Sequence, residues 1–358
     1  MKLNCVCRNR WFAAGTVIML LFLNIVRMNM SVWAAEGEED FLQAFTAGYP
    51  EMANFLSQEE PASYAMKGLV STENIYAKGE KKGEIGIARD MTPQGVVVTD
   101  HYVIVSAYSK SHLFHSVLWV TDRKSGEYVK TVVLEGKDHV GGIGYDDTYD
   151  RIWITCTDGK GNNGAVGYVM VDEIEEYDLE RDQKCLNYDR KYILEGISRT
   201  SFLAVDSGYL YSGEFRDKAD GTLCVYSLDL RGLPETEKIE TKSGAYPAVK
   251  PCKTVLIPDE IQGVTLDDGM IVFSRSYGPK DSDIIAYRFS GPDGLSDLKR
   301  KEAMVDIDAP PFLEQIFLDG TEFFALFESS AQEYLNRKNV LHIDRVLKFD
   351  LTGQSMFA

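Results

Sequence analysis

The sequence IQGVTLDDGMIVFSRSYG, residues Ile261–Gly278, holds the unit from which the fold is built. A short apolar run, Gly263–Leu266, leads into an Asp-Asp-Gly turn, and a second apolar run, Met270–Phe273, follows it. Valine, isoleucine and phenylalanine favour strands, and Asp-Gly between two apolar runs is a strong indication of a tight hairpin. The stretch therefore predicts an antiparallel β-hairpin that ends in a polar patch, Ser274–Tyr277.

The same unit occurs four more times along the chain. The other copies begin with PQGVVV at Pro93, VGGIGY at Val140, TSFLAV at Thr200 and LEQIFL at Leu313. Aligned on Gly95, Gly142, Ser201, Gly263 and Gln315, the copies lie 47, 59, 62 and 52 residues apart. Repeats of about 40–50 residues indicate propeller blades. The two longer intervals contain insertions, Asp172–Asp189 and Arg231–Val249, which we interpret as long loops and not as further blades.

Apolar runs after each hairpin predict a third and a fourth strand, so that four strands form a blade. The fifth copy lacks a fourth strand, because only Asp350–Ala358 follow its third. The run Gly83–Ala88 stands immediately before the first copy, where a fourth strand would be expected. We therefore predict an all-β fold, a five-bladed β-propeller closed by this N-terminal strand, since closure removes exposed sheet edges. Six blades are the alternative, if Ala65–Tyr76 contains further strands.

The N-terminal region has the features of a secretory signal. Lys2, Arg8 and Arg10 precede the apolar run Trp11–Val26, and small residues follow at Ala34 and Ala35. Residues 1–35 thus predict a secreted or cell-envelope protein, either cleaved near Ala34 or held in the membrane by an uncleaved anchor. Residues 36–82 predict an acidic arm with short helical turns, and residues 83–358 the propeller.

Composition limits the partners. The formal net charge of −17 argues against nucleic acid and anionic lipid as partners. We also expect a monomer, which contacts a membrane only through an uncleaved N-terminus. The ligand could be a protein, a peptide or a small molecule. Cys224, on a predicted third strand, and Cys252, beside the fourth strand of the same blade, could form a disulfide; buried free thiols are the alternative.

Polar side chains should gather on one face of the propeller. In a blade, the connection into the first strand and the loop after the second lie on the same face, around the axis. The candidate ligand-binding residues there are Gln94, Tyr108, Arg216, Gln262, Arg275, Tyr277 and Gln315. Glu214, Glu314 and Glu328 could hold Ca²⁺ or another divalent cation. Glu314, Glu214 and His139 are the candidates for acid–base catalysis. Alternatively, these groups only hydrogen-bond across the central tunnel.

The repeated pattern of residues 83–350 resembles secreted bacterial β-propellers of the broad YVTN/quinoprotein-like type. One blade, IQGVTLDDGMIVFSRSYGPKDSDIIAYRF, is similar to a blade of plant-type glutaminyl cyclotransferases, and the match includes Gln262, Gly263, Ser274, Tyr277 and Gly278. This resemblance implies five blades and acyl transfer at the loop face. Gluconolactonase-like propellers are similar in shape and hold a divalent metal with Glu, Asn and Asp from separate blades, but no Asn stands at the first-strand starts here, so that metal site does not carry over.

We interpret the chain as a secreted or envelope-associated binding or scaffold module. The alternative is an enzyme with its site on the central loop face, either a glutaminyl cyclase-like acyl transferase or a metal-dependent lactonase or hydrolase. If the chain is an enzyme, we expect a deep pocket on the axis that contains an acid or base with a shifted pKa. If the chain is a scaffold, we expect the central tunnel to be closed by polar residues that hydrogen-bond to one another.

Overall fold

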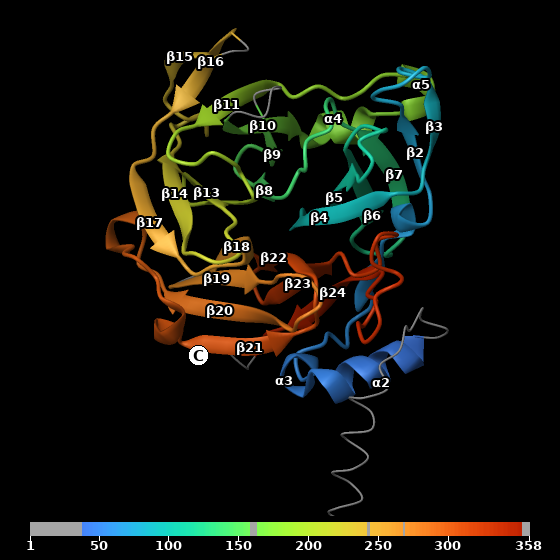
Figure 1. Cartoon of the computed structure of the whole chain (residues 1–358), viewed down its shortest axis with the longest axis vertical. Coiled ribbons are helices and arrows are strands. Elements are labelled where there is room, and N and C mark those ends of the chain that lie inside the picture. The colour runs from blue at the N-terminus through green and yellow to red at the C-terminus, as the bar shows by residue number, and fades with distance from the viewer. Residues whose placement is uncertain (1–37, 158–162, 242–243, 268, 353–358) are drawn as a thin grey trace, which may run out of the picture.

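A computed structural model of the chain describes residues 38–157, 163–241, 244–267 and 269–352, and it is a five-bladed β-propeller (Figure 1). The predicted signal segment, residues 1–35, lies outside the described residues. The four strands of each blade form an antiparallel sheet, and they are ordered from the axis of the ring toward its outer edge. The first blade contains β4 (Met91–Val98), β5 (Tyr102–Ser109), β6 (Val117–Asp122) and β7 (Tyr128–Val133), and the second contains β8 (Ile143–Asp146), β9 (Arg151–Thr157), β10 (Gly164–Met170) and β11 (Arg190–Leu194). The third blade contains β12 (Phe202–Asp206), β13 (Tyr209–Glu214), β14 (Gly221–Ser227) and β17 (Lys253–Ile257). The fourth contains β18 (Ile261–Asp267), β19 (Met270–Arg275), β20 (Ser282–Arg288) and β21 (Val305–Ala309).

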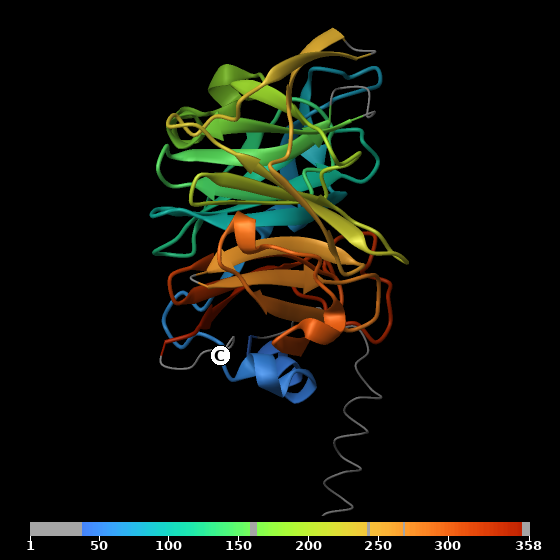
Figure 2. The same cartoon turned by 90° about the vertical axis from the view of Figure 1, so that its left-hand side faces the viewer.

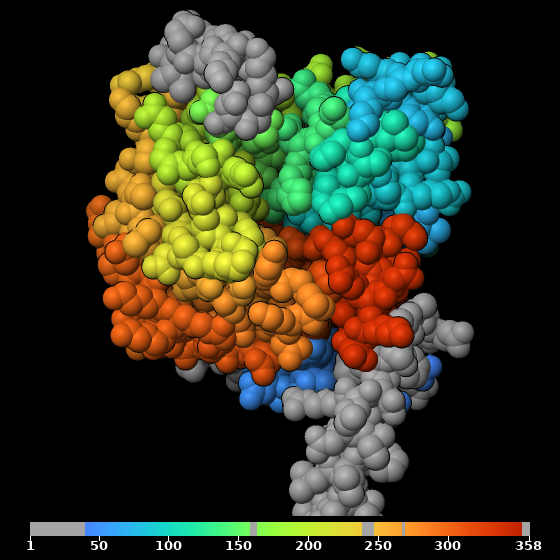
Figure 3. Space-filling view, in the orientation of Figure 1, coloured from blue at the N-terminus to red at the C-terminus, as the bar shows by residue number. Residues whose placement is uncertain are grey.

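The first strand of every blade lies at the centre of the ring. These strands contact one another in the cyclic order β4, β8, β12, β18 and β22 (Leu313–Asp319), and β22 returns to β4. All eight residues of β4 are buried, as expected of a strand that packs on both faces. The space-filling view shows the molecule hollowed near the middle of the ring (Figure 3). The repeated hairpins therefore build the wall of a central channel, as the sequence predicts.

The strand that closes the ring is a different one from the strand predicted. The fifth blade has the order β1 (Ser63–Ala65), β24 (Arg345–Asp350), β23 (Glu322–Phe327) and β22, with Tyr64 opposite Val346. Gly83–Ala88 instead supplies β3 (Ile85–Ala88), which pairs with β2 (Thr72–Ile75) in a separate two-stranded sheet beside the first blade. Ile85 and Ile87 of β3 are exposed, so their apolar character misled the prediction. Neither β2 nor β3 forms a sixth blade.

The two insertions are structured and are not loops. The first contains α4 (Val171–Glu176) and α5 (Leu179–Asp182), which lie against the first blade; Lys130 Nζ there donates to the carbonyl oxygens of Glu175 and Tyr177. The second contains the hairpin β15 (Glu237–Thr241) and β16 (Gly244–Val249), which extends the second blade because β16 pairs with β11. As predicted, neither insertion forms a further blade.

The N-terminal helices lie beneath the fourth and fifth blades (Figures 1 and 2). They are α2 (Glu38–Gly48) and α3 (Pro50–Ala53). Phe41, Phe45 and Met52 are buried in one apolar cluster with Phe349 of β24. The helices therefore cover the outer end of the blade that β1 completes. No helix among the described residues is long and apolar enough to cross a membrane.

Of the two alternatives for Cys224 and Cys252, the disulfide is not formed. Both are free thiols, as are Cys156 and Cys185. The sulfur of Cys224 is buried 3.4 Å from Thr254 Oγ1, whereas Cys252 is exposed and its thiol donates to the carbonyl oxygen of Val225.

Candidate functional site

Glycine allows the inner strands to approach closely. A Cβ atom at Gly142 would lie 2.5 Å from the backbone nitrogen of Leu203, on the first strand of the next blade. At Gly95 it would lie 2.8 Å from Ser106 Oγ and 2.9 Å from Gln315 Oε1. Real Cβ atoms do not approach other atoms this closely, so a larger residue at either position would require its neighbours to move. The ends of the inner strands, with their polar side chains, are thereby drawn together around the axis.

Hydroxyl groups on the second strands fix this arrangement. Ser106 Oγ donates to the carbonyl oxygen of Val140 in the next blade (2.9 Å) and accepts from the backbone of Gly95 (3.0 Å). Thr155 Oγ1 accepts from the backbone of Gly142 at 2.9 Å, and Ser274 donates to the carbonyl oxygen of Glu314. These bonds satisfy backbone groups that the sheet ladders leave free.

Gln315 closes the centre of the channel. Its Nε2 donates to the carbonyl oxygens of Val96 (2.8 Å) and Ile143 (2.7 Å), and its Oε1 accepts from the backbone of Ile143 (3.0 Å). One side chain from the fifth blade thus bonds to the first and second blades. Gln315 was a candidate ligand-binding residue, but all these bonds join it to backbone, and it is fully buried. Its position separates two cavities on opposite faces of the ring.

The larger cavity, which we name the loop-face pocket, has a volume of about 860 Å³, in the range of small-molecule sites. The connections into the first strands and the loops after the second strands form it, as predicted. The lining residues that matter here are Gln94, His139, Thr200, Phe215, Gln262, Tyr277, Phe312, Glu328 and Tyr334, with Arg199, Lys280 and Arg337.

Two glutamic acids lie in and below the floor of this pocket. Glu328 follows β23 and lines the pocket, whereas Glu314, on β22, is buried beneath it. The two carboxyl groups hydrogen-bond to each other. Gln94 Nε2 donates to Glu328 Oε2 at 3.0 Å, and Gln262 Nε2 donates to Glu314 Oε1 at 3.4 Å. The first, fourth and fifth blades therefore meet in one polar cluster.

Burial and mutual repulsion make this pair hold a proton. Desolvation, together with the charge of Glu328, raises the pKa of Glu314 well above its usual value. Desolvation raises the pKa of Glu328 to about 7, although hydrogen bonds from Tyr334, Glu314 and Gln94 favour its ionised form. Two carboxyl groups so close cannot easily both ionise. Near pH 7 Glu314 is therefore the protonated partner, and Glu328 can gain or lose a proton.

The loop after β23 holds Glu328 from above. Tyr334 hydrogen-bonds to Glu328, and its ring lies 4.5 Å from that of Phe312. The neighbouring Glu333 is fixed to the first blade by Lys110 (2.6 Å) and by Thr92 Oγ1 (3.1 Å). This loop thus bridges the fifth and first blades across the edge of the pocket.

His139 stands in the wall of the pocket. Its ring lies 4.3 Å from that of Tyr108, which is buried behind it. Desolvation by the surrounding walls, with Lys110 and His112 nearby, lowers the pKa of His139. The imidazole is therefore neutral near pH 7 and can donate or accept a hydrogen bond inside the pocket.

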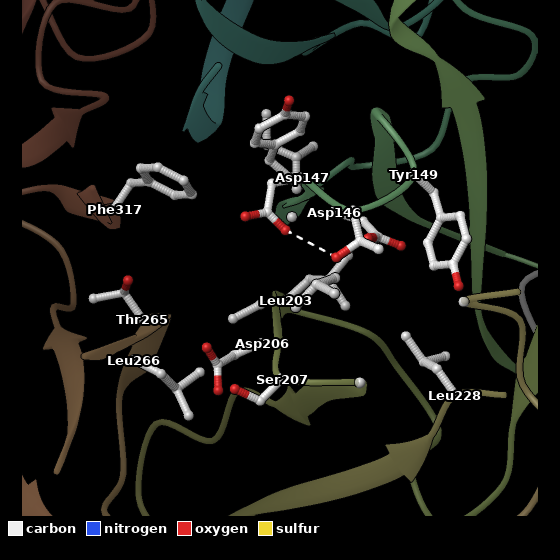
Figure 4. A pocket seen from close by; sticks show the side chains of 18 of the residues that line it. Asp146, Asp147, Tyr149, Leu203, Asp206, Ser207, Leu228, Thr265, Leu266 and Phe317 are labelled. Atoms are coloured by element: carbon white, nitrogen blue, oxygen red, sulfur yellow. Dashed lines mark hydrogen bonds between the residues drawn. The ribbon is translucent and has the colours of Figure 1, made fainter. Parts of the chain in front are cut away.

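The second cavity opens on the face formed by the hairpin turns (Figure 4). Its volume is about 640 Å³, and Gln315 and Phe317 form part of its lining. Figure 4 shows the carboxylates of Asp146, Asp147 and Asp206 around it. Among the described residues, six aspartates and no lysine or arginine line this cavity. The loop-face pocket has the opposite character, since the described residues that line it include Arg199, Lys280 and Arg337 but a single carboxyl group, that of Glu328.

Glu214, Arg216 and Arg275 also lie outside the lining of the loop-face pocket. Glu214 accepts from Ser198 Oγ (2.5 Å) and pairs with Arg216 (2.9 Å). Arg275 forms ion pairs with Asp259 (3.0 Å), Glu260 (2.7 Å) and Asp283 (2.9 Å). These bonds give Glu214, Arg216 and Arg275 structural partners. Tyr277, by contrast, lines the pocket and is half exposed, with its ring 5.7 Å from that of Phe215.

The structure does not bring together the three predicted metal ligands. Ca²⁺ takes six to eight oxygen ligands. Glu314 and Glu328 meet, but Glu214 is bound to Ser198 and Arg216 instead. Within the part of the chain that the structure describes, no three His, Cys, Asp or Glu side chains form a group that could hold a metal ion. The expected three-carboxylate site is therefore not formed.

Sequence reasoning did not find three aromatic residues of the pocket. Phe215 directly follows β13 and Phe312 directly precedes β22, in both cases without any motif, and Tyr334 lies six positions after Glu328 in the loop that follows β23. The left-handed backbone of Phe312 (φ 64°) turns the chain just before β22. No pattern in the sequence marks that turn.

No family model matches the chain, and no curated protein matches it in sequence. Solved structures do resemble it. A glutaminyl cyclase of Myxococcus xanthus is 12% identical, with 80% of this chain and 94% of that chain covered and a TM-score of 0.43. The WD40 propeller domain of Doa1 is 13% identical (80% and 99% covered, TM-score 0.36). A putative oxidoreductase (glucose dehydrogenase) of Thermus thermophilus is 11% identical (74% and 88% covered, TM-score 0.41). At this level of similarity none of them assigns a substrate or a site residue to this chain. The chain is a five-bladed β-propeller, and its site has to be interpreted from its own residues.

Proposed function

We propose that this propeller is a binding module for a small molecule, which enters the loop-face pocket and contacts Glu328. The observation that supports this is the buried, hydrogen-bonded Glu314–Glu328 pair in and below the floor of a pocket of about 860 Å³. A protein partner would contact the rim loops and would not need a buried proton-binding pair. The closure at Gln315 also favours a ligand that enters and leaves by the same opening.

Ligand binding to the native state must raise its stability, which gives a direct test. A library of small polar compounds is screened by thermal unfolding of the wild-type protein. Compounds that raise the melting temperature are then tested on Glu328→Gln and on Asp206→Asn, a matched substitution beside the opposite cavity. We expect the shift to disappear in Glu328→Gln and to persist in Asp206→Asn. A shift that survives in Glu328→Gln, or a screen without hits, would contradict the proposal.

Acid–base catalysis in the same pocket is the second candidate. It is supported by the pKa of Glu328, which at about 7 suits a group that must exchange a proton near neutral pH. Glutaminyl cyclase-like acyl transfer is one reaction of this kind, since the amine that attacks must lose a proton and the leaving amine must gain one. Conversion of glutaminyl peptides, lost in Glu328→Gln, would move the assignment from binding to catalysis. The lactonase and hydrolase alternatives need a metal, for which the described residues offer no three-ligand group.

We also propose that the protein acts outside the cytoplasm, as a secreted or envelope-bound monomer. The proposal is supported by the basic start and apolar run of residues 1–35 and by the acidic composition. Fusion of residues 1–40 to a reporter enzyme that is active only after export tests it. An inactive fusion would contradict it.

A further inference from the structure

We infer that the ligand of the loop-face pocket is a small zwitterion, with an ammonium group that meets Glu328 in the floor and a carboxylate that meets Arg199, Lys280 and Arg337 in the lining. The inference rests on the proposed function and names the chemical class of its ligand. It follows from two sets of charged side chains in the pocket, one negative and one positive, that have no counter-ion among the described residues.

The first imbalance is at the floor. Glu328 is about nine-tenths buried and accepts hydrogen bonds from Gln94 and Tyr334, but these donors are neutral. Among the described residues, no lysine, arginine or histidine forms an ion pair with Glu328 or Glu314. A buried negative charge without a counter-ion is unfavourable, and a ligand cation would supply one. Of the two residues, Glu328 is the one that lines the pocket, where a ligand can reach it.

The second imbalance concerns the cations. Arg199, Lys280 and Arg337 come from three different connections, all three are exposed, and none forms an ion pair within the described part of the chain. Arg123, by contrast, is paired with Asp319 and Glu322. Three cations around one pocket are notable in a chain of net charge −17, and every charged side chain among the described residues that line the opposite cavity is an aspartate. Arginine and lysine suit a carboxylate, and the arrangement would also draw an anion toward the opening.

The two ends together define the ligand. A simple amine would satisfy the floor but would be repelled by the cations, whereas a simple carboxylate would be repelled by Glu328. The aromatic rings of Phe215, Tyr277 and Phe312 lie among the pocket residues and can contact a short carbon chain between the charges. A linear amino acid meets all three requirements.

Linear ω-amino acids, from glycine to 8-aminooctanoate, provide a probe series that varies the distance between the charges. Their binding to the full chain is measured by calorimetry, beside alkylamines and alkanoates of equal length. We expect one chain length to bind best and both monofunctional series to bind about tenfold or more weakly, because each loses one charged contact. An alkylamine or an alkanoate that binds as well as the best amino acid would overturn the inference.

Variants separate the two ends. Glu328→Gln should weaken the best amino acid and the alkylamines alike. The double substitution Lys280→Gln and Arg337→Gln should weaken the amino acid about tenfold and leave the alkylamines unweakened. Lys218→Gln is the matched control, since Lys218 is an exposed cation of a loop on the same face but does not line the pocket. Equal losses in the double variant and in Lys218→Gln would exclude a specific carboxylate site.

Proton release gives an independent readout. An ammonium beside Glu328 favours the ionised form of the pair, so binding near pH 7 should release protons. The titratable groups that face the pair are Tyr108, Glu333 and Tyr334, with His139 beside Tyr108. Of these, the tyrosines have raised pKa values and stay neutral. Binding enthalpies should therefore differ between phosphate and Tris buffers, and the difference should be smaller in Glu328→Gln. If no amino acid binds while library compounds still need Glu328, the zwitterion is wrong and the proposed function stands.

Discussion

Gln94 Nε2 donates to Glu328 Oε2 at 3.0 Å, although the two residues lie 234 positions apart and in different blades. Gln94 belongs to the first inner strand of the ring, and Glu328 follows the second strand of the last blade. The bond therefore forms only when the first and fifth blades stand side by side. The pocket and the closure of the ring are parts of the same arrangement.

The Glu314–Glu328 pair should make the protein less stable as the pH rises. Both carboxyl groups have a higher pKa in the folded chain than the usual value near 4.5. The native state therefore binds more protons than the unfolded state above that value, and stability falls as the pH rises through about 7. We expect a loss of about 1–3 kcal/mol from pH 5 to pH 8. Urea unfolding at pH 5, 6.5 and 8 measures it. Glu314→Gln, which imitates the protonated partner, should remove the part of this dependence that comes from Glu314 and leave the part that comes from Glu328, whose pKa is raised mainly by desolvation. An unchanged slope would contradict the shared proton.

Gln315 should be important for stability and not for binding. Gln315→Leu leaves the carbonyl oxygens of Val96 and Ile143 and the backbone nitrogen of Ile143 without their side-chain partner in a buried site. We expect a loss of about 2–5 kcal/mol in the free energy of unfolding. Gln262→Leu is the comparison, because it removes one bond of 3.4 Å and should lose about 1 kcal/mol or less. Equal losses from both substitutions would show that Gln315 has no special role.

The glycines of the inner strands should differ in how they tolerate alanine. At Gly142 the added methyl group meets the backbone of Phe202 and Leu203, which cannot move without the neighbouring blade. At Gly95 it meets side-chain atoms of Ser106, Gln315 and Ile143, which can shift. We expect Gly142→Ala to destabilise the fold by about 3 kcal/mol or more and Gly95→Ala by about 1–2 kcal/mol. Thermal unfolding of both variants tests the order, and the reverse order would contradict the contacts described.

Tyr64 should show which N-terminal strand closes the ring. It is buried in β1, its hydroxyl donates to the carbonyl oxygen of Arg123 at 2.9 Å, and its ring lies 6.2 Å from that of Phe324. Tyr64→Ala should lose about 3–5 kcal/mol, as large buried side chains do. Ile87→Ala, on the exposed side of β3, should change stability by about 0.5 kcal/mol or less. A larger effect at Ile87 than at Tyr64 would restore Gly83–Ala88 as the closing strand.

The inner hairpins could be predicted because each combines an apolar run with a turn residue, and three of the five copies also have a glycine at a fixed place. The closing strand could not, because Ser63–Ala65 is three residues long and has no alternation of its own. Gly83–Ala88 looks more like a strand, yet its isoleucines face solvent. Its partner β2 lies in the segment from Ala65 to Tyr76 that we considered for a sixth blade.

The site, like the fold, could be predicted only where its residues belong to the repeat. The positions of Gln94, Gln262 and Glu314 relative to the repeat identify them as residues of one face, and the structure places them in one cluster. Glu314 contacts Glu328 and not Glu214. This contact depends on the path of the long loop after β23, and the sequence of that loop has no pattern that would predict its path. Tyr334 is positioned by the contact of its ring with Phe312 and by the attachment of Glu333 to the first blade, so only the folded chain shows it.

The pairing of β1 with β24 joins an early strand to the last strand of the propeller. During synthesis, β1 leaves the ribosome long before its partner exists, and four blades can form while the fifth is incomplete. Contacts so distant in sequence form slowly, and an unpaired strand edge can pair with another molecule in the meantime. The final strand therefore decides when the nascent chain becomes a closed ring. Growth of the protein at low temperature, or with additional chaperones, should raise the yield of monomer for this reason.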